Sequence, residues 1–141
     1  MQRIFPELTQ ENTPFWTGGE RGELMIAHCD KCNHSIHPPQ VICPVCLSRN
    51  VTPHPAKGTG VVLACTINRQ QWAPDMVVPF SLAIVELDGE PGVRLTARII
   101  DCDPESVAIG DAVTVAFEND RDIWFPVFRP VSPEPAAQIR Q

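Results

Sequence analysis

The chain has 141 residues, 43% of them hydrophobic and 20% charged, which suits one or two small folded modules and argues against a large enzyme with its own deep cleft. The net charge of −6 argues against a nucleic-acid partner, because phosphate neutralisation needs concentrated basic residues and the 11 Lys and Arg residues are scattered. The sequence does not open with a basic segment followed by an apolar core, and no apolar run approaches the roughly 18 residues that span a bilayer. We therefore expect a cytoplasmic protein with no membrane partner, in which paired cysteines stay reduced and bind a metal.

Residues 1–23 are predicted to form an N-terminal helical segment. Pro14 suits the first turn of a short helix, and the Gly18–Gly19 pair is expected to end it. Phe15 and Trp16 supply an apolar face. Two interpretations of this aromatic pair stay open: it covers the chain's own core, or it contacts a partner or ligand.

Residues 24–56 contain two Cys-x-x-Cys pairs, Cys29/Cys32 and Cys43/Cys46, separated by ten residues. In each such turn the two thiolates are separated by about the distance between two ligands of a tetrahedral zinc ion. The two turns together therefore supply four ligands and fill the coordination sphere. The spacing predicts structural Zn²⁺, and rubredoxin-type iron is the alternative because it uses the same ligand geometry. Since four thiolates leave no position for water, we expect the metal to stabilise the fold and to take no part in catalysis.

The residue after each cysteine pair is expected to need a left-handed backbone, which Asn tolerates and Leu does not. Asn33 suits this conformation, whereas Leu47 is predicted to cost on the order of 1 kcal/mol.

The other histidines and cysteines are not expected to bind the metal. Cys65 and Cys102 lie within strand-like sequence patterns, and we expect them to be buried small apolar residues rather than reactive thiols. With four cysteines available, the histidines near the cluster are predicted to be surface residues or neighbours of the ligands; they are His28, His34, His37 and His54.

Residues 57–130 are predicted to form a small β-barrel. Five β-branched or apolar runs alternate with turn residues and are predicted strands, namely residues 58–68, 80–87, 92–100, 111–117 and 123–129. Five short strands without a long helix favour the OB-fold barrel, because a β-sandwich usually needs about seven strands. The Pro-rich residues 131–141 lack periodicity and are expected to form a flexible tail, so the fold class is mainly β.

The ordered combination of motifs resembles the acyl-CoA-associated zinc-ribbon/OB-fold family known as domain of unknown function 35. The matching motifs are FW (15–16), GEL (22–24), CDKC (29–32), HPP (37–39), CPVC (43–46), GTGVV (58–62), PFSLAIVELDG (79–89), VRL (93–95), IGDAVTVAFE (109–118) and FRP (128–130). The sequence departs from the family at Leu47, where Gly is usual, and at Gln40, where Arg is frequent.

The resemblance implies a rubredoxin-like zinc ribbon between N-terminal helices and an OB-fold. It also implies a non-catalytic auxiliary subunit of a thiolase-like acyl-CoA enzyme: a thiolase, an acyltransferase or a steroid side-chain retro-aldolase. The subunit would stabilise the complex and help to shape the acyl-CoA site. In agreement, the sequence contains no GxSxG, Walker loop or Ser/His/Asp spacing. The alternatives are a single-stranded nucleic-acid-binding module and an autonomous acyl-CoA-binding protein.

Residues 69–79 connect the first two predicted barrel strands, where OB-folds often bind ligands. Trp72 and Met76 are predicted either to anchor a partner, since aromatic and Met side chains are enriched at interfaces, or to cover the barrel end. Arg69 either meets a CoA phosphate, as the resemblance suggests, or is solvated.

Overall fold

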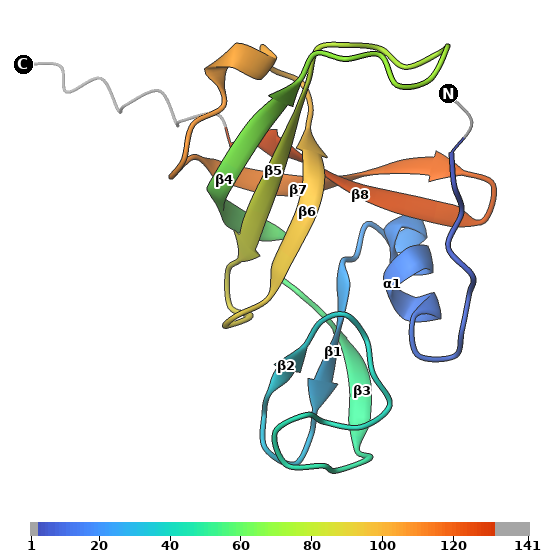
Figure 1. Ribbon diagram of the computed structural model, residues 1–141. Coiled ribbons are helices and arrows are strands. Elements are labelled where there is room, and N and C mark those ends of the chain that lie inside the picture. The colour runs from blue at the N-terminus through green and yellow to red at the C-terminus, as the bar shows by residue number, and fades with distance from the viewer. Residues whose placement is uncertain (1–2, 132–141) are drawn as a thin grey trace, which may run out of the picture.

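The computed structural model describes residues 3–131 and arranges them as a helical segment, a small ribbon and a barrel (Figure 1). The helical segment contains α1 (Thr13–Thr17) and the 3₁₀ turn η1 (Gly18–Arg21), and the ribbon contains β1 (Met25–Cys29), β2 (Ser35–Ile36) and β3 (Val51–Pro55). The barrel contains β4 (Thr59–Asn68), β5 (Phe80–Leu87), β6 (Arg94–Ile99), the 3₁₀ turn η2 (Pro104–Ser106), β7 (Ala112–Asp120) and β8 (Ile123–Pro130). Apart from Val131, the predicted tail lies outside the described residues.

The five barrel strands close in the order β4-β5-β6-β8-β7, which confirms the predicted OB-fold class. All neighbouring pairs are antiparallel except β6 and β8, which are parallel and join where Ile99 faces Phe128. Alternate residues of β5 and β6 are buried, as expected for strands with one face on the core. The most deeply buried barrel side chains, each at most 1% exposed, include Val62, Val85, Val113 and Phe128.

The prediction that Cys65 is buried was wrong. The register of β4 shifts between Val62 and Ala64, and β4 pairs with β7 only over residues 59–61 while its pairing with β5 continues to Asn68. The second half of β4 therefore leaves the closed barrel, and the Cys65 side chain is exposed. Cys102 is only partly buried and lies just beyond β6 rather than within a strand.

The ribbon is a three-stranded antiparallel sheet in the order β2-β1-β3. Strand β1 confirms the extended run expected before the first cysteine pair. The apolar run before the second pair, residues 41–44, forms no strand.

The α-helix α1 ends at the predicted glycine pair, since its last residue is Thr17 and its C-cap residue is Gly18. The chain continues through η1, and the left-handed residue that ends this turn is Gly22, with φ of +72°. The pair is also required by packing: a Cβ on Gly19 would lie 2.5 Å from the Trp124 Cβ atom, and one on Gly18 would lie 2.5 Å from the Glu23 carbonyl oxygen. Glycine here lets the helical segment lie directly against the β7–β8 hairpin.

The ribbon is attached to the barrel through shared core residues and hydrogen bonds. Leu24 and Ile26 belong to the same buried cluster as the barrel side chains. The Ser35 hydroxyl donates a hydrogen bond to the Glu90 carboxylate in the β5–β6 turn. In the part of the chain that the structure describes, no helix is long and apolar enough to cross a membrane.

Candidate functional site

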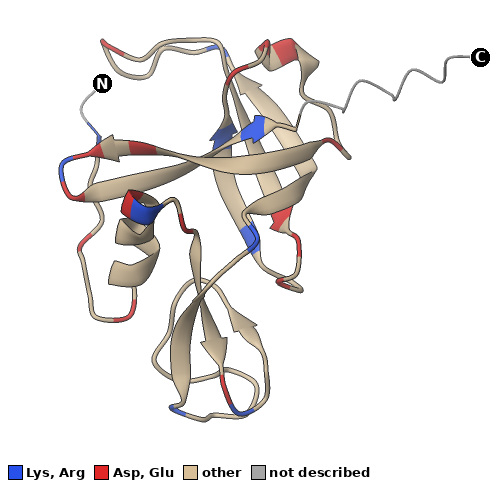
Figure 2. Ribbon diagram, turned by 180° about the vertical axis from the view of Figure 1, so that it is seen from behind, with Lys and Arg blue, Asp and Glu red and all other residues tan. Residues whose placement is uncertain are grey.

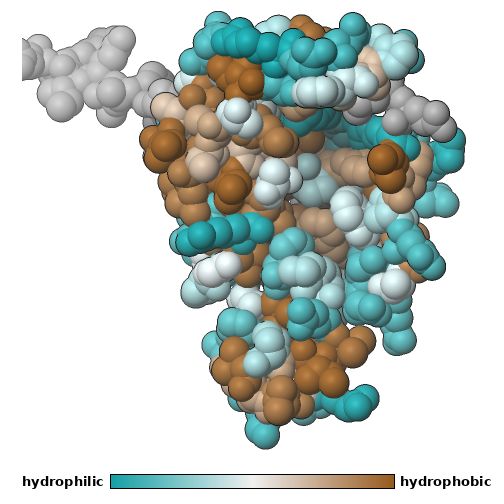
Figure 3. All heavy atoms as spheres, in the orientation of Figure 1, coloured by the Kyte–Doolittle hydropathy of each residue, from teal (hydrophilic) through white to brown (hydrophobic). Residues whose placement is uncertain are grey.

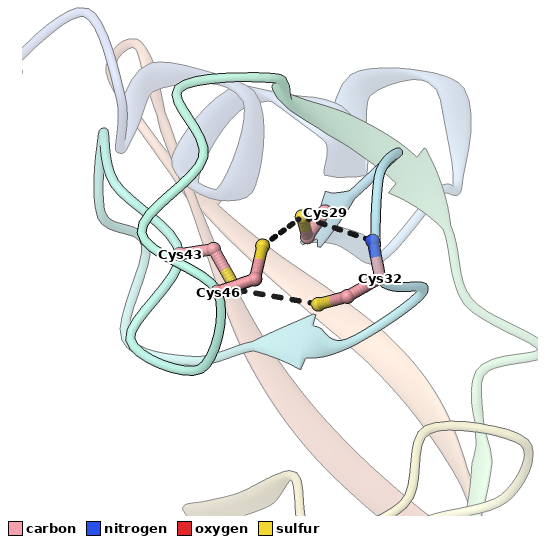
Figure 4. A group of neighbouring side chains, drawn as sticks. All are labelled: Cys29, Cys32, Cys43 and Cys46. Carbon is pink, nitrogen blue, oxygen red and sulfur yellow. Dashed lines mark hydrogen bonds between the residues drawn. The ribbon is translucent and has the colours of Figure 1, made fainter.

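The four predicted metal ligands converge at the end of the ribbon (Figure 4). The Sγ atoms of Cys29 and Cys46 are 3.6 Å apart, as are those of Cys32 and Cys43, and all four sulfurs lie within 4.8 Å of one another. Zinc–sulfur bonds of about 2.3 Å in a tetrahedron place sulfurs about 3.8 Å apart, whereas disulfide sulfurs are about 2.0 Å apart. The cluster therefore fits one tetrahedral metal ion and no disulfide.

Backbone turns around the first cysteine of each pair hold the sulfurs in place. The Cys32 amide lies 3.5 Å from the Cys29 sulfur, and the Val45 amide lies 3.4 Å from the Cys43 sulfur. The residue after the second cysteine of each pair closes the turn with a positive φ angle, which is 67° at Asn33 and 61° at Leu47. The predicted left-handed conformation is confirmed at both positions, including the unfavourable one at Leu47.

The metal-free thiols differ in acidity. A hydrogen bond from the Cys32 backbone amide lowers the pKa of Cys29 to about 7. Loss of water around the Cys32 sulfur, together with the neighbouring sulfurs, raises the pKa of Cys32 to about 12. Cys32 is an exposed residue, but its sulfur points into the cluster (Figure 4). Four thiolates therefore form together only when a cation replaces the protons, and four sulfur ligands leave no coordination position for a substrate.

Phe15 and Trp16 pack within this chain. Their rings meet edge to face with centroids 4.9 Å apart, and Phe15 is only 6% exposed. Together with His37 and Phe125 they line a cleft of about 600 Å³ between the helical segment, the ribbon and the barrel. The cleft has room for part of a ligand, so contact of the aromatic pair with a ligand stays a prediction.

The loop at residues 69–79 projects beyond the open end of the barrel (Figure 1). Trp72 is 74% exposed, and its indole nitrogen donates a hydrogen bond to Asn68 Oδ1 at 3.0 Å. The Asn68 amide nitrogen also lies 3.8 Å from the Met76 sulfur, which is half-buried. The loop is thus internally bonded and presents the Trp72 ring to solvent. Arg69 forms an exposed ion pair with Glu105, and its contact with a CoA phosphate stays a prediction.

Besides Trp72, the structure shows an exposed group of apolar side chains on the ribbon that was not predicted from the sequence. Figure 3 shows hydrophobic atoms gathered at the end of the ribbon that is farthest from the barrel. The exposed fractions are 58% for Val41, 64% for Val45 and 74% for Leu47. For two of these residues a signal was available in the sequence: Val45 lies between the cysteines of the second pair and Leu47 directly follows that pair. The Val45 amide faces the Cys43 sulfur, and its side chain is exposed.

Basic residues are scattered over the described part of the chain. Figure 2 shows Lys and Arg spread over the ribbon and the barrel and interleaved with Asp and Glu. Arg3 and Arg98 both pair with Glu118 on the barrel surface, which leaves less positive charge for a phosphate backbone.

Comparison with known families and curated proteins assigns both modules. Residues 16–52 match "ChsH2, rubredoxin-like zinc ribbon domain", and residues 53–118 match "ChsH2, C-terminal OB-fold domain". A DUF35 domain-containing scaffold protein of Methanothermobacter thermautotrophicus is 33% identical over 73% of this chain and 77% of its own length. A probable enoyl-CoA hydratase alpha subunit of Thermomonospora curvata is 30% identical over 92% of this chain, but this chain spans only 40% of its length.

Solved structures show the same architecture. A chain of the Ltp2-ChsH2(DUF35) aldolase is 28% identical and superposes with a TM-score of 0.80, covering 89% of this chain and 98% of that one. A DUF35-family protein of unknown function from Sulfolobus solfataricus, 15% identical over 86% of each chain, shares the fold with a TM-score of 0.59. This chain belongs to the DUF35 family, as a ChsH2-type rubredoxin-like zinc ribbon followed by an OB-fold.

Proposed function

We propose that this chain is a non-catalytic auxiliary subunit of an acyl-CoA enzyme and acts through a partner subunit. The observation that carries the proposal is the similarity to the Ltp2-ChsH2(DUF35) aldolase, in which 98% of the matching chain is covered. The relatives named as scaffold proteins support a structural role. The cysteine cluster supports it too, because its closed ligand set leaves no reactive position.

The partner is proposed to be thiolase-like, as the resemblance of the motifs implies. The exposed Trp72, which is hydrogen-bonded to Asn68, supports a partner surface on the loop at residues 69–79, because Trp is enriched among interface anchors. The cleft beside Phe15 and Trp16 is proposed to help shape the acyl-CoA site.

A hydratase complex is the second candidate for the partner enzyme. It is favoured by the names of two relatives, the Thermomonospora curvata protein and a 3-oxo-4,17-pregnadiene-20-carboxyl-CoA hydratase alpha subunit of Mycobacterium tuberculosis. This chain is 30% identical to the second relative and spans 35% of its length.

The metal is proposed to be Zn²⁺. Thiolates bind zinc and iron with the same geometry, so metal analysis of the purified chain decides between them. Zinc predicts a colourless protein with one zinc ion per chain, and the red colour of an Fe³⁺–thiolate centre would contradict it.

Co-expression with a thiolase-like protein tests the function. We expect the two chains to co-purify and the complex, but neither chain alone, to cleave or form a C–C bond in an acyl-CoA. Trp72→Ala should weaken assembly at least about tenfold, as expected for an interface anchor. Ile109→Ala, which alters another exposed apolar side chain (72%), is the matched control. Thioester turnover by the isolated chain, or tight oligonucleotide binding, would overturn the proposal in favour of the alternatives.

A further inference from the structure

Three side chains of types that can bind a metal ion, His28, Asp30 and His54, lie together on the face of the ribbon sheet opposite the cysteine core. His28 stands between Ala27 and Cys29 on β1, and both of those neighbours face the ribbon core. Because side chains alternate along a strand, His28 points to the other face. There the register of β1 and β3 brings it close to His54, and the imidazole centroids are 5.1 Å apart.

Asp30, within the first Cys-x-x-Cys turn, completes the group. Its Oδ1 atom is 3.2 Å from His54 Nε2 and 3.9 Å from His28 Nδ1. One possible ligand atom from each of the three residues lies within 4.8 Å of the other two. Metal–nitrogen and metal–oxygen bonds of about 2.1 Å in a tetrahedron place ligand atoms about 3.4 Å apart. The observed separations bracket this value, so small side-chain rotations suffice to bind one ion.

The hydrogen bonds around the group involve Thr52 and Asp30. His54 Nε2 lies 2.9 Å from the Thr52 hydroxyl and 3.2 Å from Asp30 Oδ1, so an ion that binds this nitrogen replaces those contacts. The Thr52 hydroxyl donates to Asp30 Oδ2 at 2.8 Å, which fixes the carboxylate through the oxygen that does not face His28. The His28 Nδ1 atom is buried and has no hydrogen-bond partner. A buried nitrogen without a partner is unfavourable unless something binds it, so this atom points independently to a ligand.

We propose that His28, Asp30 and His54 form a second site for a divalent transition-metal ion, separate from the cysteine cluster. Two imidazoles and one carboxylate select Zn²⁺, Cu²⁺, Ni²⁺ or Co²⁺ rather than Mg²⁺ or Ca²⁺. The side chains are 22%, 43% and 50% exposed, in the same order, so water completes the coordination and the ion exchanges readily.

The bound ion would join the first cysteine turn and β1 to β3. A ligand that binds only the folded state stabilises it, so occupancy at this site should strengthen the ribbon. The inference does not depend on the proposed partner, because the site is formed by this chain alone.

The test is a titration of the full chain, loaded beforehand with one zinc ion at the cysteine cluster, with Co²⁺. We expect one further equivalent to bind with the weak visible absorption of nitrogen and oxygen ligands. Intense near-ultraviolet thiolate-to-cobalt charge transfer should be absent. His54→Ala should weaken this binding at least about tenfold, the loss that even an outer partner of a metal ligand can cause. His34→Ala, which changes a ribbon histidine outside the group, is the matched control.

The zinc content of each variant is measured in parallel, so that loss of the second equivalent is separated from loss of the ribbon fold. Failure of the zinc-loaded chain to bind Co²⁺, unchanged binding by His54→Ala, or cobalt entering only the cysteine cluster would each overturn the proposal. Competition with Ni²⁺ and Cu²⁺ should show progressively tighter binding, following the ordinary order of divalent ions.

Discussion

The ribbon and the barrel of this chain are stabilised in different ways. The barrel has a large shared core, in which Val62, Val85 and Phe128 are completely buried, and a closed ring of strand pairings. The separate core of the ribbon contains four buried residues, two of which are the predicted metal ligands Cys29 and Cys43. Apolar burial contributes roughly 25 cal/mol per Å², so a core of this size contributes little. From this comparison we infer that a bound metal ion would stabilise the ribbon in place of the large apolar core that the ribbon lacks.

Substitution of a metal ligand should have the largest effect. We expect Cys43→Ser to lose the metal and to unfold residues 29–52, while the barrel strands stay folded on their own core. Amide hydrogen exchange resolved along the chain measures this difference. Cys65→Ser, which changes an exposed barrel thiol, should leave both regions unchanged. A metal-free ribbon with native protection would refute the contrast between the two regions.

Removal of a large barrel side chain should have the next largest effect. Phe128 is 0% exposed at the closure of β6 and β8. Phe128→Ala should lower the free energy of unfolding by about 3–5 kcal/mol in urea denaturation. Ile84→Ala, at a position 39% exposed on the outside of β5, should cost much less. An equal loss of unfolding free energy in Phe128→Ala and Ile84→Ala would mean that burial in the barrel core does not determine stability.

Relief of backbone strain should strengthen the ribbon. Leu47 has φ of 61° and is 74% exposed, so Leu47→Asn removes strain and loses little burial. We expect about 1 kcal/mol of stabilisation, or about fivefold tighter metal binding in competition with a chelator. Val45→Asn replaces an exposed residue without a positive φ and should give no gain. An equal gain in stability for Leu47→Asn and Val45→Asn would mean that the gain comes from replacing an exposed apolar side chain and not from relief of backbone strain.

The smallest expected effect concerns pH. Burial lowers the pKa of His37, at the cleft between ribbon and barrel, below its ordinary value. The unfolded chain keeps a value of about 6.5 and takes up a proton first as the pH falls. His37 therefore supports full stability above about pH 6.5 and progressively less below it. His37→Gln should flatten the decline between pH 7 and 5.5 in thermal unfolding; an unchanged decline would contradict this assignment.

The positions of the barrel strands could be predicted from the sequence because their apolar residues alternate. The cysteine cluster could be predicted because the spacing of two Cys-x-x-Cys pairs is typical of a tetrahedral metal site. Strand β3 could not be predicted, since it contains Pro53 and Pro55, which are tolerated only because β3 is an edge strand. Exposure of Cys65 depends on a bulge that leaves no mark in the composition. The approach of His28 and His54 depends on the register of β1 and β3.

The central claim is that the metal-bound cysteine cluster stabilises the fold of the ribbon, while the function of the chain depends on an interface with a partner subunit. Replacement of the ribbon metal by Cd²⁺, a larger ion that thiolates also bind, tests it most directly. We predict that the cadmium-loaded chain assembles with the proposed thiolase-like partner and supports the same turnover of acyl-CoA as the zinc-loaded chain. Turnover that changes with the identity of the metal, at equal assembly, would contradict the claim.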